Sequence, residues 1–350
     1  MGIPLLPTII TGILATVLTG LSPQTSLSVP EKPGRTYRVL FYNVENLFDT
    51  FDDTLTSDED FTPSGRMHWT YKRYETKLNN TYKVLVAAGA SWQPPDIIGL
   101  CEVENRRTLD DLINITPFSK YAYRIVHENS ADRRGIDVAL LYNPQTVCFL
   151  SSECYRIKKR GLLTRDILYC KVKLGGDTCH VLVNHWPSRS EGQLETEPDR
   201  LAAAGLLKYV SDSLFKRATH ARIIIMGDFN DDPLDESLAG TLKATGELKN
   251  TFPARLYNLT QVPPSGPVRG TLKYQGEWNT FDQIIVSGSL LTRGKGLKVS
   301  EDGYHVFNAS FLLVPDKKYE GFKPFRTYNG YLYQGGFSDH LPVYIDLLEK

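Results

Sequence analysis

Short apolar runs alternate with longer amphipathic stretches along the chain from residue 36 onward. Runs that are apolar almost throughout are typical of strands buried on both faces of a sheet. We therefore predict strands at Arg38–Tyr42, Asp96–Cys101, Ile136–Tyr142, Leu168–Leu174, Thr178–Asn184, Arg222–Met226, Phe281–Val286 and Leu341–Leu347. Gly175 and Gly176 lie between the fourth and fifth of these strands and predict a hairpin.

Three amphipathic stretches predict helices, at Tyr71–Ala90, Thr108–Ile115 and Pro198–Lys216. The third has apolar residues at intervals of three and four, which form one stripe on a helix. These residues are Leu201, Ala204, Leu207, Val210 and Leu214. Strands buried on both faces need covering layers, so the pattern predicts an α/β fold of layered sheets covered by helices.

The chain shows no internal repeat and no linker in its middle, which indicates one domain over residues 36–350. Residues 1–35 are expected to lie outside it. Ile3–Leu21 carries no charge and is rich in Leu, Ile, Val, Thr and Gly, while Pro30–Gly34 resembles a linker. This apolar segment favours a cleaved export signal, with an uncleaved membrane anchor and a buried helix as alternatives. We expect an exported protein that is periplasmic, secreted or held at the surface.

Composition and charge restrict the classes of function. The chain has 350 residues, of which 41% are hydrophobic, enough for a sizeable core. Its 40 basic and 40 acidic residues cancel, whereas a protein that holds nucleic acid by its overall field has a basic excess. Any phosphate recognition must therefore be local. Among the five cysteines, Cys101 lies in an apolar run and is expected to be a packed thiol, and the spacing favours no pairing of the others.

Polar groups follow four of the predicted strands at the point where each strand ends. Asn43 and Glu45 follow the first, and Glu102 and Glu104 follow the second. His185 follows the fifth strand, and the sixth is followed by Asp228, Asn230, Asp231 and Asp232. One acidic residue at a strand end is usually a turn residue. Four such ends, with an Asp-His pair before the last strand, indicate one shared site.

The chain resembles the deoxyribonuclease-like endonuclease/exonuclease/phosphatase family, which includes pancreatic deoxyribonuclease, abasic-site endonucleases, bacterial sphingomyelinases and inositol-polyphosphate phosphatases. Each matching segment is a moderate signal alone, but together they follow the family's order over about 300 residues. The segments are FYNVEN (41–46), DIIGLCEVEN (96–105), RGIDVALLY (134–142), VNHWPSR (183–189), IIIMGDFND (223–231), TFDQIIV (280–286) and FSDHLPV (337–343). The resemblance implies a four-layered α/β sandwich, in which two packed mixed β-sheets are flanked by helices.

The resemblance also implies a divalent metal site and a set of catalytic groups. Glu102, Asn43 and Asp339 are the expected metal ligands, and their oxygen atoms suit Mg²⁺, with Mn²⁺ or Ca²⁺ as alternatives. His340 is expected to be a general base or phosphate ligand, supported by the carboxylates of Asp339 and Asp282. His185 is expected to contact the phosphate and to protonate the leaving oxygen. The implied roles of the remaining residues are water activation by Asp228, phosphate binding by Asn230 and substrate binding by Arg189.

Three further features leave alternatives open. Asp137 and Tyr142 are candidates for an additional acidic residue or tyrosine found in some relatives. The stretch Asp49–Asp60 contains six acidic residues, which form either a solvated loop or a second cation site. The tyrosine-rich stretch Gly321–Gly336 precedes Asp339-His340 and either packs on the domain or contacts bases or lipid.

We therefore expect a divalent-metal-dependent phosphoesterase that hydrolyses phosphodiester bonds, with nucleic acid as the expected substrate. A lipid phosphodiesterase similar to sphingomyelinases, or a small-molecule phosphoesterase, is the alternative within the same class. A non-catalytic surface binding protein is the alternative from another class. The N-terminus could anchor the chain to a membrane, and the sequence implies no protein partner.

Overall fold

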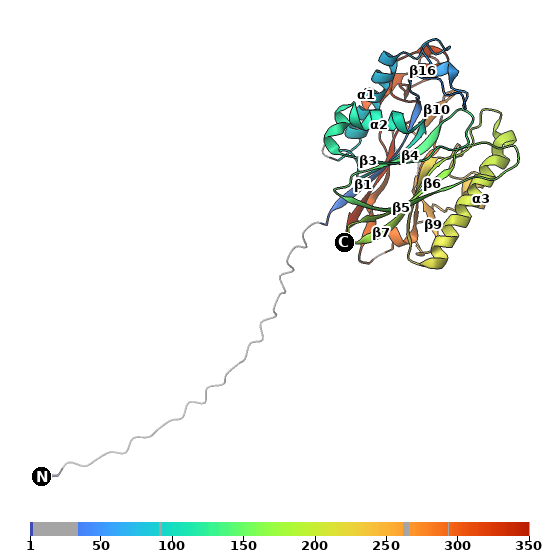
Figure 1. Cartoon of the computed structure of the whole chain (residues 1–350). Coiled ribbons are helices and arrows are strands. Elements are labelled where there is room, and N and C mark those ends of the chain that lie inside the picture. The colour runs from blue at the N-terminus through green and yellow to red at the C-terminus, as the bar shows by residue number, and fades with distance from the viewer. Residues whose placement is uncertain (3–33, 91–92, 262–265, 293, 350) are drawn as a thin grey trace. The chain divides into compact units, whose positions relative to one another are not determined.

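The structure is a computed structural model that describes residues 1–2, 34–90, 93–261, 266–292 and 294–349. One compact unit runs over Gly34–Lys350 (Figure 1). The predicted export or anchor segment at residues 3–21 lies outside the described residues. Within the described residues, every helix is too short or too polar to cross a membrane.

Two six-stranded mixed sheets form the centre of the compact unit (Figure 1). The first sheet has the order β13 (Leu297–Val306), β18 (Val343–Glu349), β1 (Thr36–Leu47), β2 (Ile97–Val103), β4 (Asp137–Tyr142) and β3 (Arg124–His127). The second has the order β5 (Val147–Tyr155), β6 (Ile167–Leu174), β7 (Asp177–His185), β8 (Arg222–Asp228), β12 (Asp282–Ser287) and β9 (Leu256–Asn258). The pairs β1–β2 and β7–β8 are parallel, and the other neighbours are antiparallel.

Helices and small hairpins complete the unit. The α-helices are α1 (Tyr71–Ala87), α2 (Arg106–Asn114) and α3 (Gln193–Arg217). Short helical turns are η1 (Glu59–Phe61), η2 (Pro117–Tyr121), η3 (Glu236–Thr241), η4 (Leu259–Gln261), η5 (Gly288–Leu290) and η6 (Ser310–Leu312). Three two-stranded hairpins are β10 (Leu272–Tyr274) with β11 (Glu277–Asn279), β14 (Leu313–Pro315) with β15 (Phe322–Pro324), and β16 (Tyr328–Asn329) with β17 (Leu332–Tyr333).

Alternating side chains of the central strands fill three separate cores. On β1, Val39 and Phe41 face the second sheet, whereas Leu40 and Tyr42 face the core shared with α1 and α2. On the outer face of the second sheet, α3 packs its apolar side chains against β7 and β8. Because successive side chains of a strand point to opposite faces, fully apolar strands supply both layers at once. The predicted four-layered sandwich of two mixed sheets flanked by helices is confirmed (Figure 1).

The eight predicted strands are the eight inner strands of the two sheets, and the predicted hairpin at Gly175-Gly176 joins β6 to β7. The prediction missed β3, β5, β9 and β13, which are the four edge strands. Edge strands such as β3 and β5 are only partly covered and carry more polar residues, whereas β9 is buried but only three residues long. β5, for example, is mostly exposed. The third helix begins at Gln193 rather than at Pro198, which lies inside α3.

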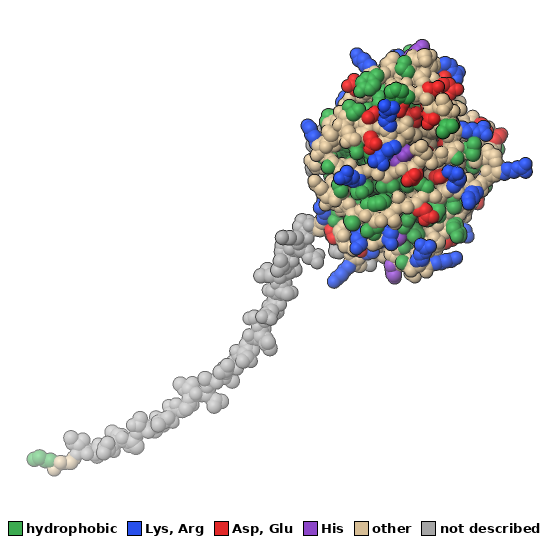
Figure 2. All heavy atoms as spheres, in the orientation of Figure 1, with side chains coloured by type: hydrophobic (Ala, Val, Ile, Leu, Met, Phe, Trp, Pro, Cys, Tyr) green, Lys and Arg blue, Asp and Glu red, His purple; other side chains and the backbone are tan. Residues whose placement is uncertain are grey.

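All five cysteines are free in the structure. Cys101 is fully buried on β2, as expected for a packed thiol, and burial raises its pKa well above the ordinary value of a thiol. Acidic and basic side chains are interspersed over the face shown in Figure 2, as the zero net charge suggests.

Candidate active site

The ends of the parallel strand pairs bring the predicted polar residues to one edge of the sandwich. His185 ends β7 and is in register with Asp228 at the end of β8. Asp228 is in turn in register with Asp282 at the start of β12. Gly227 allows this close strand pairing, because a Cβ there would lie 2.5 Å from the carbonyl oxygen of Asn184. Asn43 on β1 and Glu102 on β2 approach from the first sheet.

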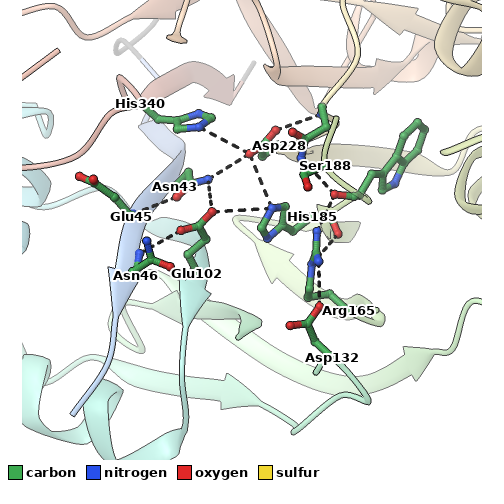
Figure 3. Close-up of polar contacts among 12 residues, drawn as sticks. Asn43, Glu45, Asn46, Glu102, Asp132, Arg165, His185, Ser188, Asp228 and His340 are labelled. Carbon is green, nitrogen blue, oxygen red and sulfur yellow. Dashed lines mark hydrogen bonds and ion pairs between the residues drawn. The ribbon is translucent and has the colours of Figure 1, made fainter. Parts of the chain in front are cut away.

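Asn43 connects the two sheets at this edge (Figure 3). Its fully buried amide Nδ2 donates to Glu102 Oε1 at 3.3 Å and to Asp228 Oδ2 at 3.0 Å. His185 Nε2 lies 3.9 Å from the same Glu102 oxygen and 3.7 Å from the same Asp228 oxygen. Glu102 also accepts a hydrogen bond from the backbone N–H of Asn46 at 2.9 Å. Glu102, Asp228 and His185 therefore share one small polar space.

His340 lies on the opposite side of Asp228, just before β18. Its Nδ1 is 2.7 Å from Asp282 Oδ2, and its Nε2 is 3.8 Å from Asp228 Oδ2. Asp282 is fully buried, and its other oxygen, Oδ1, has no hydrogen-bond partner among the described residues. A carboxylate on one ring nitrogen fixes the orientation of the imidazole and directs the other nitrogen toward the site. The structure thus pairs His340 with Asp282, and the catalytic support that the resemblance implies for this pair stays a prediction.

The electrostatic surroundings of the two histidines are opposite. Burial, together with the positive charges of Arg165 and Arg134, lowers the pKa of His185 well below its usual value. Burial also opposes protonation of His340, but the carboxylates of Asp282 and Asp228 outweigh it and hold its pKa well above the usual value. Burial raises the pKa of Asp228 itself to about 6. Perturbed values clustered in one place are typical of functional sites.

Four non-glycine residues at this edge have left-handed backbone conformations. The φ angles are 52° at Glu45, 54° at Asn46, 60° at Glu102 and 51° at Asn230. The registers of β1 and β2 shift at the same places, between Asn43 and Leu47 and between Cys101 and Val103. Such bulges turn side chains away from the regular alternation, and strained backbone of this kind concentrates at functional sites. The strain is offset by the hydrogen bonds that these residues make.

Asn230 lies at the same edge, after β8. Its backbone N–H donates to Asp228 Oδ1 at 3.0 Å, and its side chain donates to the carbonyl of Trp186 at 3.0 Å. The structure therefore brings together Asn43, Glu102, His185, Asp228, Asn230, Asp282 and His340. The individual roles assigned to them stay predictions.

Asp339 stands at the rim of this group. Its Oδ2 is 2.9 Å from the guanidinium of Arg326, which also lies 3.3 Å from Glu45. Glu45 is buried, and its pKa is raised to about 7, first by burial and then by the charge of Asp339. Lys77 of α1 completes the support by donating to Thr327 Oγ1 and to the carbonyl of Phe337, each at 2.6 Å. Asp339 is thus held by Arg326, a residue of the tyrosine-rich stretch Gly321–Gly336 that was not predicted to pair with it.

Arg189 points its guanidinium into another acidic group. Its Nη2 lies 2.9 Å from Asp231 and 2.5 Å from Asp235, and its Nε donates to the carbonyl of Asn230 at 2.6 Å. These contacts hold the loop that carries Asn230. In this arrangement the guanidinium is engaged by the protein itself, and substrate binding by Arg189 stays a prediction.

The described part of the chain contains two groups of three potential metal ligands. Within each group, the ligand atoms all lie within 4.8 Å of one another. One comprises Cys101, His185 and Asp228, and the other comprises Asp228, Asp282 and His340. Neither includes the predicted ligands Glu102 and Asp339. The amide oxygen of Asn43 accepts from the backbone N–H of Glu45, so its nitrogen is the atom that faces the two carboxylates.

Sequence reasoning missed several supporting residues. Arg165 is buried, pairs with Asp132 at 2.8 Å and donates to the carbonyls of His185 and Trp186. The Ser338 hydroxyl donates to the carbonyl of Asn43 at 2.8 Å and accepts from the backbone N–H of His340. Ser338 lies inside a matching segment and could have been noted. Arg165 belongs to no such segment, and only its tertiary contacts reveal it.

Asp137 and Tyr142, the two candidates on β4, lie at opposite ends of that strand. Asp137 pairs with His127 at 3.3 Å near the site end of β4, and Tyr142 lies at the opposite end, in register with Ile97. In the acidic loop, Asp49 and Asp58 are buried, and each accepts hydrogen bonds from backbone groups of the same loop. No loop residue belongs to either potential ligand group of the described residues.

The tyrosine-rich stretch packs on the domain in part. Tyr328 is buried against Trp69, and Tyr333 packs on Tyr328 and beneath the guanidinium of Arg73. Phe322 and Tyr331 are exposed. The prediction that this stretch packs on the domain is thus confirmed for Tyr328 and Tyr333. The side chains of Phe322 and Tyr331 are accessible to a ligand.

Comparisons with known proteins point to one family. Residues 38–350 match the Endonuclease/Exonuclease/phosphatase family. None of the curated proteins compared with the chain matches it significantly.

Several solved structures are similar to the chain in fold. A family protein from Bacteroides thetaiotaomicron has 15% identity and a TM-score of 0.58 over 91% of this chain and 99% of its own. A mannosyl-6-phosphatase from the same organism has 16% identity and a TM-score of 0.56, over 89% and 99% respectively. The D. rerio TDP2, complexed with a single-strand DNA product, has 16% identity and a TM-score of 0.53, over 89% and 98%.

Proposed function

Because the chain belongs to the Endonuclease/Exonuclease/phosphatase family, a family of phosphoester hydrolases, we propose that it is a divalent-metal-dependent phosphodiesterase that cleaves nucleic acid. The observation that carries this proposal is the convergence of two carboxylates, an amide and two histidines at one edge of the sandwich (Figure 3). The presence of this complete set argues against the alternative hypothesis of a non-catalytic binding protein. Ordinary packing would not gather so many buried polar groups from two sheets.

The donor set fits a divalent cation. Glu102 and Asp228 are acidic groups joined by one amide, and an unpartnered buried oxygen of Asp282 lies close by. Hard oxygen donors of this kind suit Mg²⁺, with Mn²⁺ or Ca²⁺ as alternatives. We propose Glu102 as the main charged ligand. The predicted ligands Asn43 and Asp339 would join it only if the Asn43 amide turned its oxygen, which accepts from the Glu45 N–H, into the site and Asp339 left Arg326. When bound, the cation supplies Lewis-acid stabilisation of the negative charge on the phosphoryl group.

The protein's own residues supply the proton transfers and the positioning. The buried carboxylate of Asp228 can orient a water molecule, while the amide of Asn43 donates to that carboxylate and holds it in place. His340 is fixed by Asp282, and His185 lies across Asp228 from it, so each presents an Nε2 to the space near Asp228. General acid–base help of this kind typically contributes about 10²–10⁴-fold in rate. Asn230, held by Trp186 and Asp228, is the proposed ligand of a phosphate oxygen.

Two observations bear on the substrate. The similar D. rerio TDP2 was solved with a single-strand DNA product, which supports nucleic acid as the substrate. The similar mannosyl-6-phosphatase supports a small-molecule phosphoester as the second candidate. We further propose that the protein is exported, because residues 3–21 are uncharged and apolar.

A panel of substrates tests the proposal. Single-stranded and duplex DNA, RNA, sphingomyelin, a sugar phosphate and a generic phosphodiester would be incubated with the protein and Mg²⁺, with EDTA as the metal-free arm. We expect cleavage of nucleic acid that EDTA abolishes. Glu102→Gln should lower activity and recover part of it at high Mg²⁺, whereas Glu153→Gln, an exposed change on β5, should not. Full activity in EDTA would contradict metal dependence, and cleavage of the sugar phosphate alone would favour the second candidate.

A further inference from the structure

A groove of about 790 Å³ opens beside the candidate active site. Its walls come from the hairpin β10–β11, the hairpin β14–β15 with its turn, and residues 325–334. Arg326 and Asp339 line its inner end, so the groove begins at the rim of the site. A cavity of this size holds a ligand as large as a drug-sized molecule.

Hydrogen bonds join the start of β10, one wall of the groove, to the backbone around His340 and Asp282. Leu272 of β10 forms an isolated bridge with His340, and the Leu341 N–H donates to the carbonyl of Thr271 at 2.8 Å. The hydroxyl of the same threonine accepts from the backbone N–H of Asp282 at 3.1 Å. The position of the β10 wall relative to the site is therefore fixed by the fold.

The groove is basic, although the whole chain is neutral. Its lining contains five basic residues against two carboxylates. The basic residues are Lys273, Lys317, Lys318, Lys323 and Arg326. A local excess of three positive charges in a concave surface focuses the field on an anionic ligand.

Both carboxylates of the groove are already engaged by the protein. Asp316 accepts hydrogen bonds from the backbone N–H groups of Lys318 and Tyr319 and lies 3.3 Å from the buried amine of Lys273. Asp339 is paired with Arg326. In contrast, Lys317 and Lys318 are exposed, and no carboxylate of the described residues forms an ion pair with either. Their positive charges are therefore available to a ligand.

Aromatic side chains stand beside these lysines. Tyr274, near the tip of the hairpin β10–β11, is 64% exposed. Tyr319 packs against Gly276 of the same tip, where an added Cβ would lie 2.9 Å from the ring, and so closes the groove between the two hairpins. Cationic tracks lined with aromatic rings are typical of sites for single-stranded nucleic acid, because rings stack on bases while lysines meet phosphates.

We propose that this lysine groove binds the strand of a single-stranded nucleic acid next to the scissile phosphate, with Lys317 and Lys318 at backbone phosphates and Tyr274 against a base. The inference rests on the proposed function and assigns its substrate-binding surface. A lipid surface is the weaker occupant, since the feature is concave and its charges surround a hollow rather than a protruding apolar tip.

Direct binding tests the groove independently of turnover. Anisotropy of a fluorescein-labelled oligothymidylate would be measured with the His340→Ala protein, with and without Lys317→Glu/Lys318→Glu. We expect the double change to weaken binding about tenfold. It should also make the slope of log K against log salt shallower by about 1.4, since each phosphate contact on a single strand contributes about 0.7. Tyr274→Ala should weaken binding at least about fivefold by loss of stacking.

Matched controls separate the possible failures. Lys216→Glu/Lys249→Glu makes the same charge change at exposed positions outside the groove lining and should leave affinity and slope nearly unchanged. In proteins with His340 intact, Lys317→Glu/Lys318→Glu should lower cleavage of the oligonucleotide, whereas Lys216→Glu/Lys249→Glu should leave turnover of bis-p-nitrophenyl phosphate unchanged. If the protein cleaves the oligonucleotide but Lys317→Glu/Lys318→Glu binds it as tightly as Lys216→Glu/Lys249→Glu, the groove proposal is wrong and the proposed function stands. If the intact protein cleaves the small diester and no nucleic acid, the proposed function fails, and the strand-binding role fails with it. Loss of binding to phosphatidylserine vesicles, with oligonucleotide binding unchanged, would assign the groove to lipid.

Discussion

At the scale of single residues, Asp228 is the point on which the two sides of the site converge. Its Oδ2 accepts from Asn43 and lies within 4 Å of the Nε2 atoms of both His185 and His340. No other described group contacts both histidines so closely. Two imidazoles around one carboxylate would make a linked acid–base unit, in which each residue depends on the others.

Removal of either histidine should therefore lower kcat far more than it changes KM. His340→Ala and His185→Ala should each lower kcat by about 10²–10⁴-fold, because each takes away one proton-transferring group. The double variant should lose much less than the product of the two single losses. Steady-state kinetics on the best substrate would measure this, with His220→Ala, an exposed histidine before β8, as the control. Near-normal turnover in both single variants would favour the non-catalytic binding protein.

At the scale of elements, the loop that precedes β18 depends on α1. Lys77 is almost fully buried in α1 and donates to Thr327 and Phe337 of that loop, and burial lowers its pKa to about 8. The loop carries Asp339 and His340. Helix α1 therefore holds in place a loop that carries two candidate site residues, although it contributes none itself.

Lys77→Met should destabilise the fold and impair the site together. The change takes the Lys77 donor away from Thr327 Oγ1 and leaves the Phe337 carbonyl only its 3.4 Å bond from the Thr327 hydroxyl. It also removes the positive charge that faces Glu45, and we expect a cost of roughly 2–5 kcal/mol. Chemical unfolding would measure the free energy, and kinetics would show the accompanying loss of turnover. Lys83→Met, at an exposed position of the same helix, should stay within about 0.5 kcal/mol of the parent. Equal stability of the two variants would show that the contacts of Lys77 contribute little.

The hairpin of β6 and β7 contains a pH-sensitive contact away from the site. Tyr169 Oη lies 2.8 Å from His180 Nδ1, and burial, with the charges of Lys171 and Arg217, lowers the pKa of His180 to about 4. The unfolded chain has a histidine pKa of about 6.5, so between pH 6.5 and 4 it binds a proton that the folded chain does not. Stability from this residue is therefore complete above about pH 6.5 and is lost as the pH falls toward 4.

Thermal unfolding between pH 7.5 and 4.5 tests this contact. The Tm of His180→Gln should fall less steeply with acidification than that of the parent, because the variant lacks the group that takes up the proton. His220→Gln, at an exposed position, should follow the parent curve. A parallel decline in all three proteins would mean that His180 does not contribute to acid sensitivity.

At the scale of the whole molecule, the site lies on the seam between the two sheets. Asn43 and Glu102 come from the first sheet, and His185, Asp228 and Asp282 come from the second. The acidic groups of both sheets are drawn together here and repel one another. A cation bound between them would reduce this repulsion and stabilise the sandwich as a unit.

Mg²⁺ should therefore raise the Tm of the whole chain. A ligand at about 100 times its Kd stabilises the native state by about 2.7 kcal/mol, which corresponds to several degrees in a domain of this size. Glu102→Gln should shrink the shift, and Glu153→Gln should keep it, as followed by calorimetry with and without Mg²⁺. A full shift in Glu102→Gln would place the stabilising cation elsewhere.

The sequence alone predicted the inner architecture and marked the polar residues that the structure gathers at one edge. A strand that has a neighbouring strand on each side and a packed layer on each face is apolar along most of its length. The apolar pattern therefore predicted the eight inner strands. The polar residues that end them stood out for the same reason. Partly exposed edge strands such as β3 and β5 were not readable, because they have the composition of a loop, and the buried edge strand β9 has only three residues.

Only the tertiary structure decided how the residues of the site work together. The pairing of His340 with Asp282, rather than with its neighbour Asp339, depends on where the loop before β18 meets β12. The roles of Arg165, Arg326 and Lys77 likewise arise from contacts between segments far apart in the chain. Sequence pattern reports whether a position is buried and of what chemical type it is. It does not report which distant partner satisfies a buried charge, since that depends on the packing of both sheets.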